Sequence, residues 1–332
     1  MFAARAKARA VFPMHSLAEW LTASRARAFI GSGLLAFLAL LVPFCTWLPG
    51  AFVVLLALRQ GQPLADWVAA VVAGGTFAWG VVQAGAGPLP ALLVSLALVL
   101  PPLLIGRLLR RGGSLNLGFQ LATLAALGLL VVVYAVLADP PGIWRPMLEK
   151  LAAELDRVGV VMQNVGSGRR PQDSDLIQAS AARMWGVVAW VVLLNTMVAV
   201  FVGAAVMGVL ERVARLGPAF RELKAGRTLA VVAIVVTLAA TVFHWSLAAD
   251  AAFVFLGAFV LQGLSVLHSA RAALGISGFW LVATYLMLFW PFWPYTTVFV
   301  QGGLAIFGFM DNWVPLRERF RARPGGGPSG EA

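Results

Sequence analysis

Residues 27–59 read RAFIGSGLLAFLALLVPFCTWLPGAFVVLLALR, and this stretch decides how the chain is threaded. Its apolar part, 29–58, would form a helix of about 45 Å if it were continuous. That length exceeds the roughly 30 Å hydrocarbon core of a bilayer. Pro43, Pro49 and Gly50 interrupt helices, so we expect a hairpin of two short segments. A re-entrant hairpin fits the same residues if neighbouring helices cover the broken backbone.

The positions of the 25 lysines and arginines favour the hairpin over one long helix. With the hairpin, ten apolar runs alternate in direction, and nineteen of the 25 basic residues fall in loops on one side. A single helix would divide them into 11 and 14. Because basic loops are retained in the cytoplasm, both termini are expected there. The runs are 29–43, 44–58, 64–83, 88–106, 117–138, 184–210, 228–248, 251–270, 277–290 and 295–310.

The predicted fold class is therefore all-α, a polytopic transmembrane bundle of about ten spans, within a range of eight to ten. Hydrophobic residues make up 61% of the chain and charged residues only 12%, about half the charge of a soluble domain. The excess of arginine over lysine is typical of a GC-rich bacterium, so the bacterial inner membrane is the expected location. The predicted regions are a basic segment at 1–28, spans at 29–138, a polar insertion at 139–182, spans at 183–313 with a cytoplasmic loop at 211–227, and a basic, then flexible tail at 314–332.

The composition also limits partners and cofactors. A net charge of +11 fits loops that meet anionic lipid, and no basic polar domain points to nucleic acid. Cys45 is the only cysteine, and no Cys/His cluster has metal or haem spacing. We therefore expect the lipid bilayer as a partner, and neither nucleic acid, metal nor cofactor. In the polar insertion, helical spacing of apolar residues predicts an amphipathic helix over 147–162, either a lid over a cavity or a surface connector.

Four uncharged polar residues are expected at mid-depth in the second half: Asn195, Thr196, Gln262 and Gln301. They would bind a small neutral or zwitterionic ligand if they face one cavity, with the 147–162 helix over its outer mouth. They would hold helices together if they bond to one another or to backbone. No acid is expected at mid-depth and no catalytic motif is present, so we expect no enzyme and no catalytic residue.

Two C-terminal segments resemble the YybS-like family, bacterial multi-pass proteins with a domain of unknown function. Residues 262–268 (QGLSVLH) are similar to its Gln-Gly-Leu-x-x-x-His pattern, and 308–317 (GFMDNWVPLR) to its Gly-x-x-Asp-x-Trp-x-x-x-Arg close. The family is distantly similar to the substrate-capture subunits of energy-coupling-factor transporters. The resemblance, which covers about 28–320, implies a transport-related subunit that docks on a membrane scaffold subunit. The insertion at 139–182 has no counterpart in the pattern.

Asp311, Trp313 and Arg317 at the end of the last run have two interpretations. They form either a docking site for a partner or a local polar clasp that ends the helix. The function of the whole chain likewise has more than one interpretation. The leading hypothesis is a non-enzymatic transport-related subunit that binds a small solute between spans. The alternatives are a structural or regulatory membrane protein that acts through partners, and, least favoured, a lipid- or glycan-handling enzyme, which would need a pair such as His244 with Asp250.

Overall fold

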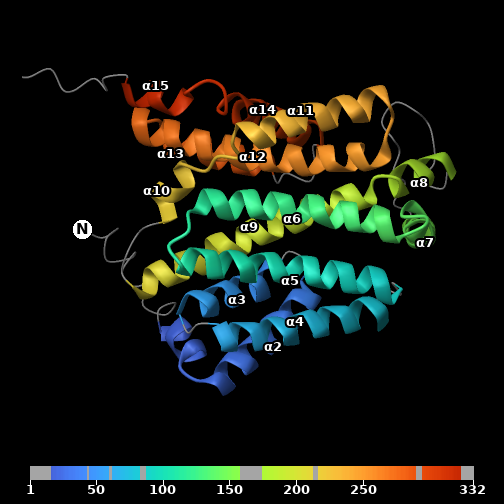
Figure 1. The fold of residues 1–332 in the computed structure, drawn as a ribbon, viewed down its shortest axis with the longest axis horizontal. Coiled ribbons are helices and arrows are strands. Elements are labelled where there is room, and N and C mark those ends of the chain that lie inside the picture. The colour runs from blue at the N-terminus through green and yellow to red at the C-terminus, as the bar shows by residue number, and fades with distance from the viewer. Residues whose placement is uncertain are drawn as a thin grey trace, which may run out of the picture.

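The computed structural model describes residues 16–42, 45–59, 62–82, 87–157, 174–211, 216–288 and 294–322. Every regular element in these ranges is a helix (Figure 1), so the all-α class is confirmed. Each of the ten apolar runs contributes one helix. They are α2 (Arg25–Leu41), α3 (Trp47–Arg59), α4 (Gln62–Val82), α5 (Pro88–Arg110), α6 (Leu115–Val136), α9 (Met184–Leu210), α11 (Arg227–Val242), α12 (Ser246–Leu274), α13 (Gly278–Leu288) and α14 (Pro294–Met310).

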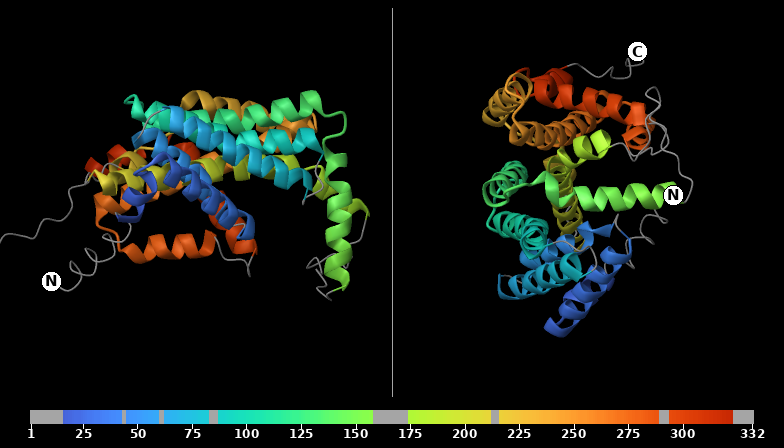
Figure 2. Two further views of the ribbon diagram at one scale, coloured as in Figure 1. Left: turned by 90° about the horizontal axis from the view of Figure 1, so that it is seen from below. Right: turned by 90° about the vertical axis from the view of Figure 1, so that its right-hand side faces the viewer.

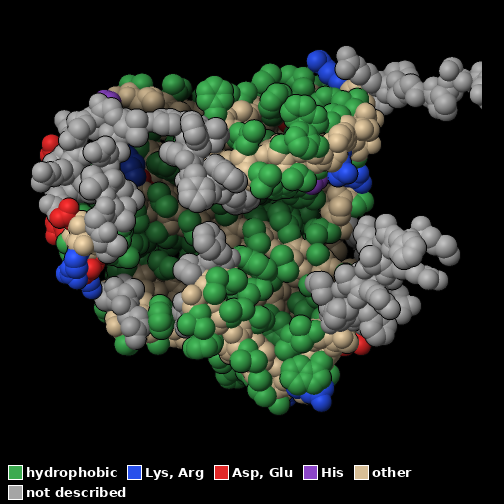
Figure 3. Space-filling model, turned by 180° about the vertical axis from the view of Figure 1, so that it is seen from behind, with side chains coloured by type: hydrophobic (Ala, Val, Ile, Leu, Met, Phe, Trp, Pro, Cys, Tyr) green, Lys and Arg blue, Asp and Glu red, His purple; other side chains and the backbone are tan. Residues whose placement is uncertain are grey.

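Within the described ranges, five helices are long and apolar enough to cross a membrane: α4, α5, α6, α9 and α12. The surface agrees with such a role, because hydrophobic side chains cover the face seen in Figure 3 and charged ones lie toward the two ends of the bundle. A helical bundle with several helices fit to span a membrane is therefore confirmed. The total of about ten spans stays a prediction.

Short helices mark the two ends of the bundle (Figure 1). At what we call the α7 end, the chain between α6 and α9 forms η2 (Pro141–Ile143), α7 (Arg145–Arg157) and α8 (Ser174–Ala181). At the opposite α10 end lie α10 (Leu216–Arg221) and α15 (Leu316–Ala322). The first described segment, 16–22, also lies at the α10 end, because Arg59 at the end of α3 donates a hydrogen bond to Thr22.

The predicted break in 29–58 is present, but its position differs from the expectation. The chain leaves the helical conformation at Val42 and resumes it at Trp47, and Pro43 falls outside the described residues. Pro49 and Gly50 do not form the turn; they lie in the first turns of α3. Proline is tolerated there because the first N–H groups of a helix have no intrahelical acceptor.

Gly50 allows neighbouring helices to pack closely and does not form a turn between α2 and α3. A Cβ atom at this position would lie 3.1 Å from the Cβ of Ala199 in α9 and 3.4 Å from Pro102 in α5. Gly203, one turn further along α9, likewise has no room for a Cβ beside Val54. These small residues let α3 and α9 approach closely, which is the usual role of Gly and Ala in membrane bundles.

Helix α9 lies in the middle of the molecule, and α12 packs beside it (Figures 1 and 2). Helix α9 packs against α3, α5, α6 and α12, and α12 packs against α6, α9, α11, α14 and α15. The seam between α12 and α14 is the tightest, since a Cβ at Gly263 would collide with the backbone of Leu304 and one at Gly308 with the backbone of Phe259. The two glycines therefore allow direct backbone contact.

Helix α7 lies across its end of the bundle, roughly perpendicular to the long helices (Figure 2). It spans 145–157 and so covers 147–157 of the predicted 147–162 helix, and the remaining residues of that prediction fall outside those described. Its packing partners are α8 and η2, and Ala152 is its buried residue. The other apolar residues of its helical stripe, such as Met147 and Leu151, are exposed. This arrangement fits an interfacial helix.

Candidate functional site

Asn195 lies where α3 begins in the middle of the bundle. It is the twelfth residue of the 27-residue α9, and only 6% of its surface is exposed. Its Oδ1 accepts a hydrogen bond of 3.0 Å from the hydroxyl of Thr46, the residue immediately before α3. Helix α3 has 13 residues and so spans about 20 Å, which places its N-terminus well inside the bundle rather than at a surface.

Two polar atoms in this part of α9 are buried without a hydrogen-bond partner among the described residues. They are Nδ2 of Asn195 and Oγ1 of Thr196, whose residue is 1% exposed. Leaving a buried donor unsatisfied costs about 1–3 kcal/mol, so such groups are rare and often mark a place where something else binds. We call Thr46, Asn195 and the start of α3 the helix-break site.

The helix-break site offers mainly hydrogen-bond donors. Besides the Asn195 amide, the first N–H groups of α3 lack acceptors within their own helix. They carry the positive end of the helix dipole. The end of α2 has the opposite character, because the last carbonyls of a helix are unpaired and carry the negative end. Val42 closes α2 in an extended conformation, with its N–H bonded to the Leu38 carbonyl.

Gln262 does not face a cavity shared with Asn195 in the part of the chain that the structure describes. It is fully buried in α12, and its Oε1 accepts from the backbone N–H of Ala225 over 2.9 Å. Its Nε2 donates to Oδ2 of Asp311 over 3.1 Å, and Asn312 Nδ2 lies 3.4 Å from the same Oε1. Every polar atom of the Gln262 side chain is therefore satisfied within the protein. It does not share a hydrogen bond with Asn195, which bonds to Thr46 in the other half of the molecule.

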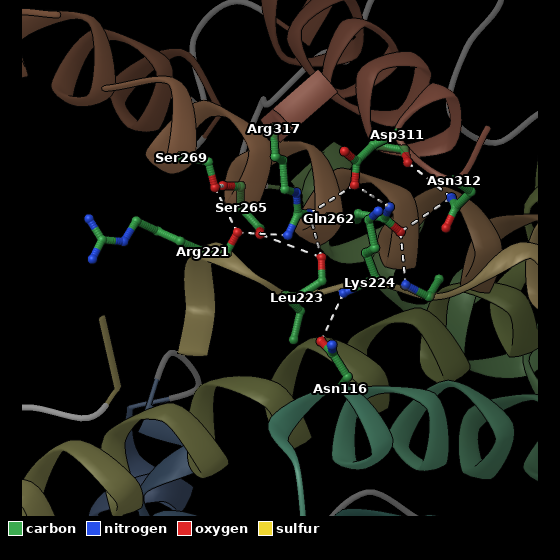
Figure 4. A network of polar contacts seen from close by, with 12 residues as sticks. Asn116, Arg221, Leu223, Lys224, Gln262, Ser265, Ser269, Asp311, Asn312 and Arg317 are labelled. Carbon is green, nitrogen blue, oxygen red and sulfur yellow. Dashed lines mark hydrogen bonds and ion pairs between the residues drawn. The ribbon is translucent and has the colours of Figure 1, made fainter. Parts of the chain in front are cut away.

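The partners of Gln262 belong to a buried network that holds the backbone of residues 221–226, which we call the clamped loop (Figure 4). Arg317 of α15 donates to the carbonyls of Arg221 and Leu223, both over 2.6 Å, and forms an ion pair with Asp311 at 3.0 Å. The network thus joins α15 and the end of α14 to a loop almost a hundred residues earlier. The remaining bonds come from Asn116, Gln120, Ser265, Ser269 and Asn312.

The three residues expected to dock a partner are divided between interior and surface. Asp311 and Arg317 are 1% and 7% exposed and belong to the network around the clamped loop. Trp313 is 44% exposed. The geometry of the first two is that of the polar clasp, the other interpretation of the same residues. Gln301, on α14, is partly exposed and makes no hydrogen bond to the described residues. No described contact therefore brings the four expected ligand residues together around one site.

One acid expected at the end of a span, Asp250, is buried near the α7 end. Asp250 lies in the second turn of α12, because α11 ends at Val242 and α12 already begins at Ser246. It is fully buried, accepts 2.8 Å from the Tyr134 hydroxyl and lies 3.5 Å from Arg183. Its partners come from α6 and the start of α9, so sequence spacing alone could not have paired them. His244, the histidine considered for an enzyme, is exposed in the preceding turn and is not among those partners.

Comparison of the chain with protein-family models, with curated proteins and with solved structures found no match. The resemblance of 262–268 and 308–317 to the YybS-like family therefore stays a prediction. Function has to be argued from the geometry of this chain alone.

Proposed function

We propose that this protein binds a small neutral or zwitterionic solute at the helix-break site and serves as a non-enzymatic, transport-related subunit of a bacterial inner membrane. The observation that carries the proposal is the buried Asn195 amide, whose Nδ2 has no partner beside the N-terminus of α3. Among the buried polar side chains in the middle of the described helices, Asn195 and Thr196 combine depth with unused hydrogen-bonding capacity.

The chemistry of the helix-break site favours a zwitterion over a simple ion. The start of α3 and the Asn195 amide would bind a carboxylate or carbonyl, while the terminal carbonyls of α2 would bind an ammonium or hydroxyl. Broken helices use their two ends in this way at the binding sites of secondary transporters. Thr46 and Asn195 carry no charge, so a solute without net charge suits them best.

The orientation that we propose places the α10 end in the cytoplasm. Nineteen of the 25 basic residues belong to that side in the ten-span arrangement, as the positive-inside tendency requires. The described segments nearest to the two termini, 16–22 and α15, lie at the α10 end. Helix α7 would then lie on the outer surface of the membrane.

An alternative role is structural or regulatory action through protein partners, without a solute pocket. The satisfied hydrogen bonds of Gln262 favour it, because they show one of the expected ligand amides serving as helix glue. Trp313 on the surface would then be part of a contact with a membrane scaffold subunit.

The test is ligand-induced stabilisation of the purified protein in detergent, screened against amino acids, nucleosides and vitamins. A solute that binds only the folded state stabilises it by about 2.7 kcal/mol at a hundredfold excess over Kd. We expect one class of solute to raise the melting temperature, and Asn195→Ala to abolish the shift. Thr76→Ala is the matched control, because the Thr76 hydroxyl bonds only to carbonyls of its own helix. A shift that survives in Asn195→Ala would contradict the helix-break site.

A further inference from the structure

A cavity of about 760 Å³ lies at the α10 end, apart from the helix-break site. Its walls come from α9, α10, the end of α12 and α13. Phe201 is the α9 residue that lines it, six positions after Asn195. Six residues turn a helix by about 600°, so the two side chains point in directions about 120° apart. Its lining residues include Phe201, Phe220, Arg221, His268, Arg271 and Tyr285.

The charge of this cavity is positive. Arg221 and Arg271 are among its lining residues, and no Asp or Glu is among the lining residues that the structure describes. The two guanidinium groups make no hydrogen bond or ion pair with the described residues, although both act electrostatically on His268. Figure 4 shows the Arg221 side chain directed away from the clamped loop, while its backbone carbonyl is held by Arg317 and Ser269. The backbone is thus fixed and the guanidinium is left for another partner.

Aromatic residues also line the cavity. The rings of Phe201 and Phe220 meet edge to face with centroids 5.2 Å apart, and Phe220 meets His268 in the same way at 5.2 Å. Nε2 of His268 lies 3.0 Å from the Tyr285 hydroxyl, so these two polar groups satisfy each other. A ligand in this cavity would therefore meet both apolar rings and two arginines that are unpaired among the described residues.

We propose that this cavity binds a phosphate ester with an apolar portion, its phosphate held by Arg221 and Arg271 and its apolar portion against Phe201 and Phe220. Arginine pairs with phosphate through two parallel N–H···O bonds, which makes it the residue suited to this anion. The volume excludes a bare phosphate ion as the natural occupant, since one water occupies only about 30 Å³ of liquid and sites for whole ligands measure about 300–1,000 Å³.

Two sources could supply such a ligand, a phospholipid of the membrane or a soluble phosphorylated compound. Basic pockets between helices on the cytoplasmic side bind lipid headgroups. That is the side of this cavity in the proposed orientation. The inference does not depend on solute binding at Asn195, because no residue is shared between the two sites.

The experiment measures binding of fluorescent phosphatidylglycerol and of fluorescent phosphatidylcholine to the full-length protein in detergent micelles, with glycerol 3-phosphate as a soluble competitor. The variants are Arg221→Gln, Arg271→Gln and their combination. Their side chains make no bond in the clamped loop, and intact melting temperatures would show that the fold is kept. Arg157→Gln is the matched control, an exposed arginine at the α7 end.

We expect the double variant to weaken phosphatidylglycerol binding at least tenfold, Arg157→Gln to leave it unchanged, and phosphatidylcholine to bind less tightly than phosphatidylglycerol. That result supports a phospholipid ligand. If glycerol 3-phosphate displaces the lipid from the wild type but not from the double variant, the result supports a soluble phosphate ester as the ligand. Equal affinity of the wild type and the double variant for phosphatidylglycerol, or no saturable binding by the wild type, would overturn the proposal.

Discussion

Gln262 and Asp311 are 49 positions apart in the sequence, and their side chains meet in a buried hydrogen bond of 3.1 Å. The same Asp311 carboxylate pairs with Arg317, which in turn holds two carbonyls of the clamped loop. Two carbonyls that accept from Arg317 and one amide that donates to Asp311 offset part of the cost of burying this pair. The network therefore stabilises one arrangement of α12, α14, α15 and the clamped loop, and its members can be tested by substitution.

Replacing Gln262 with Leu should destabilise the protein by roughly 2 kcal/mol or more, because the Ala225 N–H and one Asp311 oxygen lose a partner inside the protein. The free energy of unfolding in mixed micelles measures the effect. Gln301→Leu is the control, since that amide is partly exposed and has no bond to the described residues; its effect should stay within about 0.5 kcal/mol. Similar losses in both variants would show that the network contributes little.

Gly308→Ala should disrupt the seam between α12 and α14. The added Cβ would overlap the carbonyl of Phe259, so the two backbones would have to separate. Overpacking of this kind costs about 1–3 kcal/mol. Gly302→Ala in the same helix meets nothing within 4 Å and should be neutral or stabilising. Melting temperatures of the two variants give the comparison, and equal values would contradict the close packing described for α14.

Tyr134→Phe should destabilise the α7 end by about 1.5–3 kcal/mol, because it removes a hydrogen bond to a buried carboxylate. Tyr285→Phe removes a bond to His268 and should cost less, about 0.5–1.5 kcal/mol. A double-mutant cycle with Asp250→Asn isolates the interaction of Tyr134 with Asp250. An additive cycle would mean that the two side chains do not interact in the folded protein.

The proposed orientation predicts which positions an impermeant thiol reagent can reach in intact cells. In a Cys45→Ala background, Lys150→Cys on α7 should be labelled from outside. Ser277→Cys, between α12 and α13, should be labelled only after the membrane is opened. Both residues are exposed, so accessibility depends on the side of the membrane alone. The reversed pattern would place the α7 end in the cytoplasm.

The helices could be predicted from the sequence because a backbone in lipid must satisfy its own hydrogen bonds, so each apolar run has to be helical. The surroundings of Gln262 could not. The run 251–270 puts Gln262 near the centre of a span, and it also lies near the centre of the 29-residue α12, but the sequence does not show that the clamped loop reaches this depth, where the Ala225 N–H meets the Gln262 amide. A break within 29–58 was expected but its position at Val42 was not, and the role of Gly50 depends on Ala199 and Pro102, which no local pattern connects to it.

The candidate sites show the same limit. Asn195 was identified from its depth alone, and its contact with Thr46 spans 149 positions. Arg221 and Arg271 drew attention only as basic loop residues, because their common cavity with Tyr285 depends on how α10, α12 and α13 pack. Periodicity reports which face of a helix is apolar, and it does not report which distant side chains share that face.

The bonds from Arg317 to the clamped loop have a consequence for biosynthesis. The loop leaves the ribosome first, and the side chain that closes over its carbonyls follows 96 residues later. Until α15 has been synthesised, the carbonyls of Arg221 and Leu223 lack this donor and Asp311 lacks its counter-ion. Completion of this network is thereby tied to the synthesis of α15. A nascent chain interrupted before Arg317 would leave these polar groups without their partners among its helices, and incompletely packed intermediates of this kind are prone to aggregation.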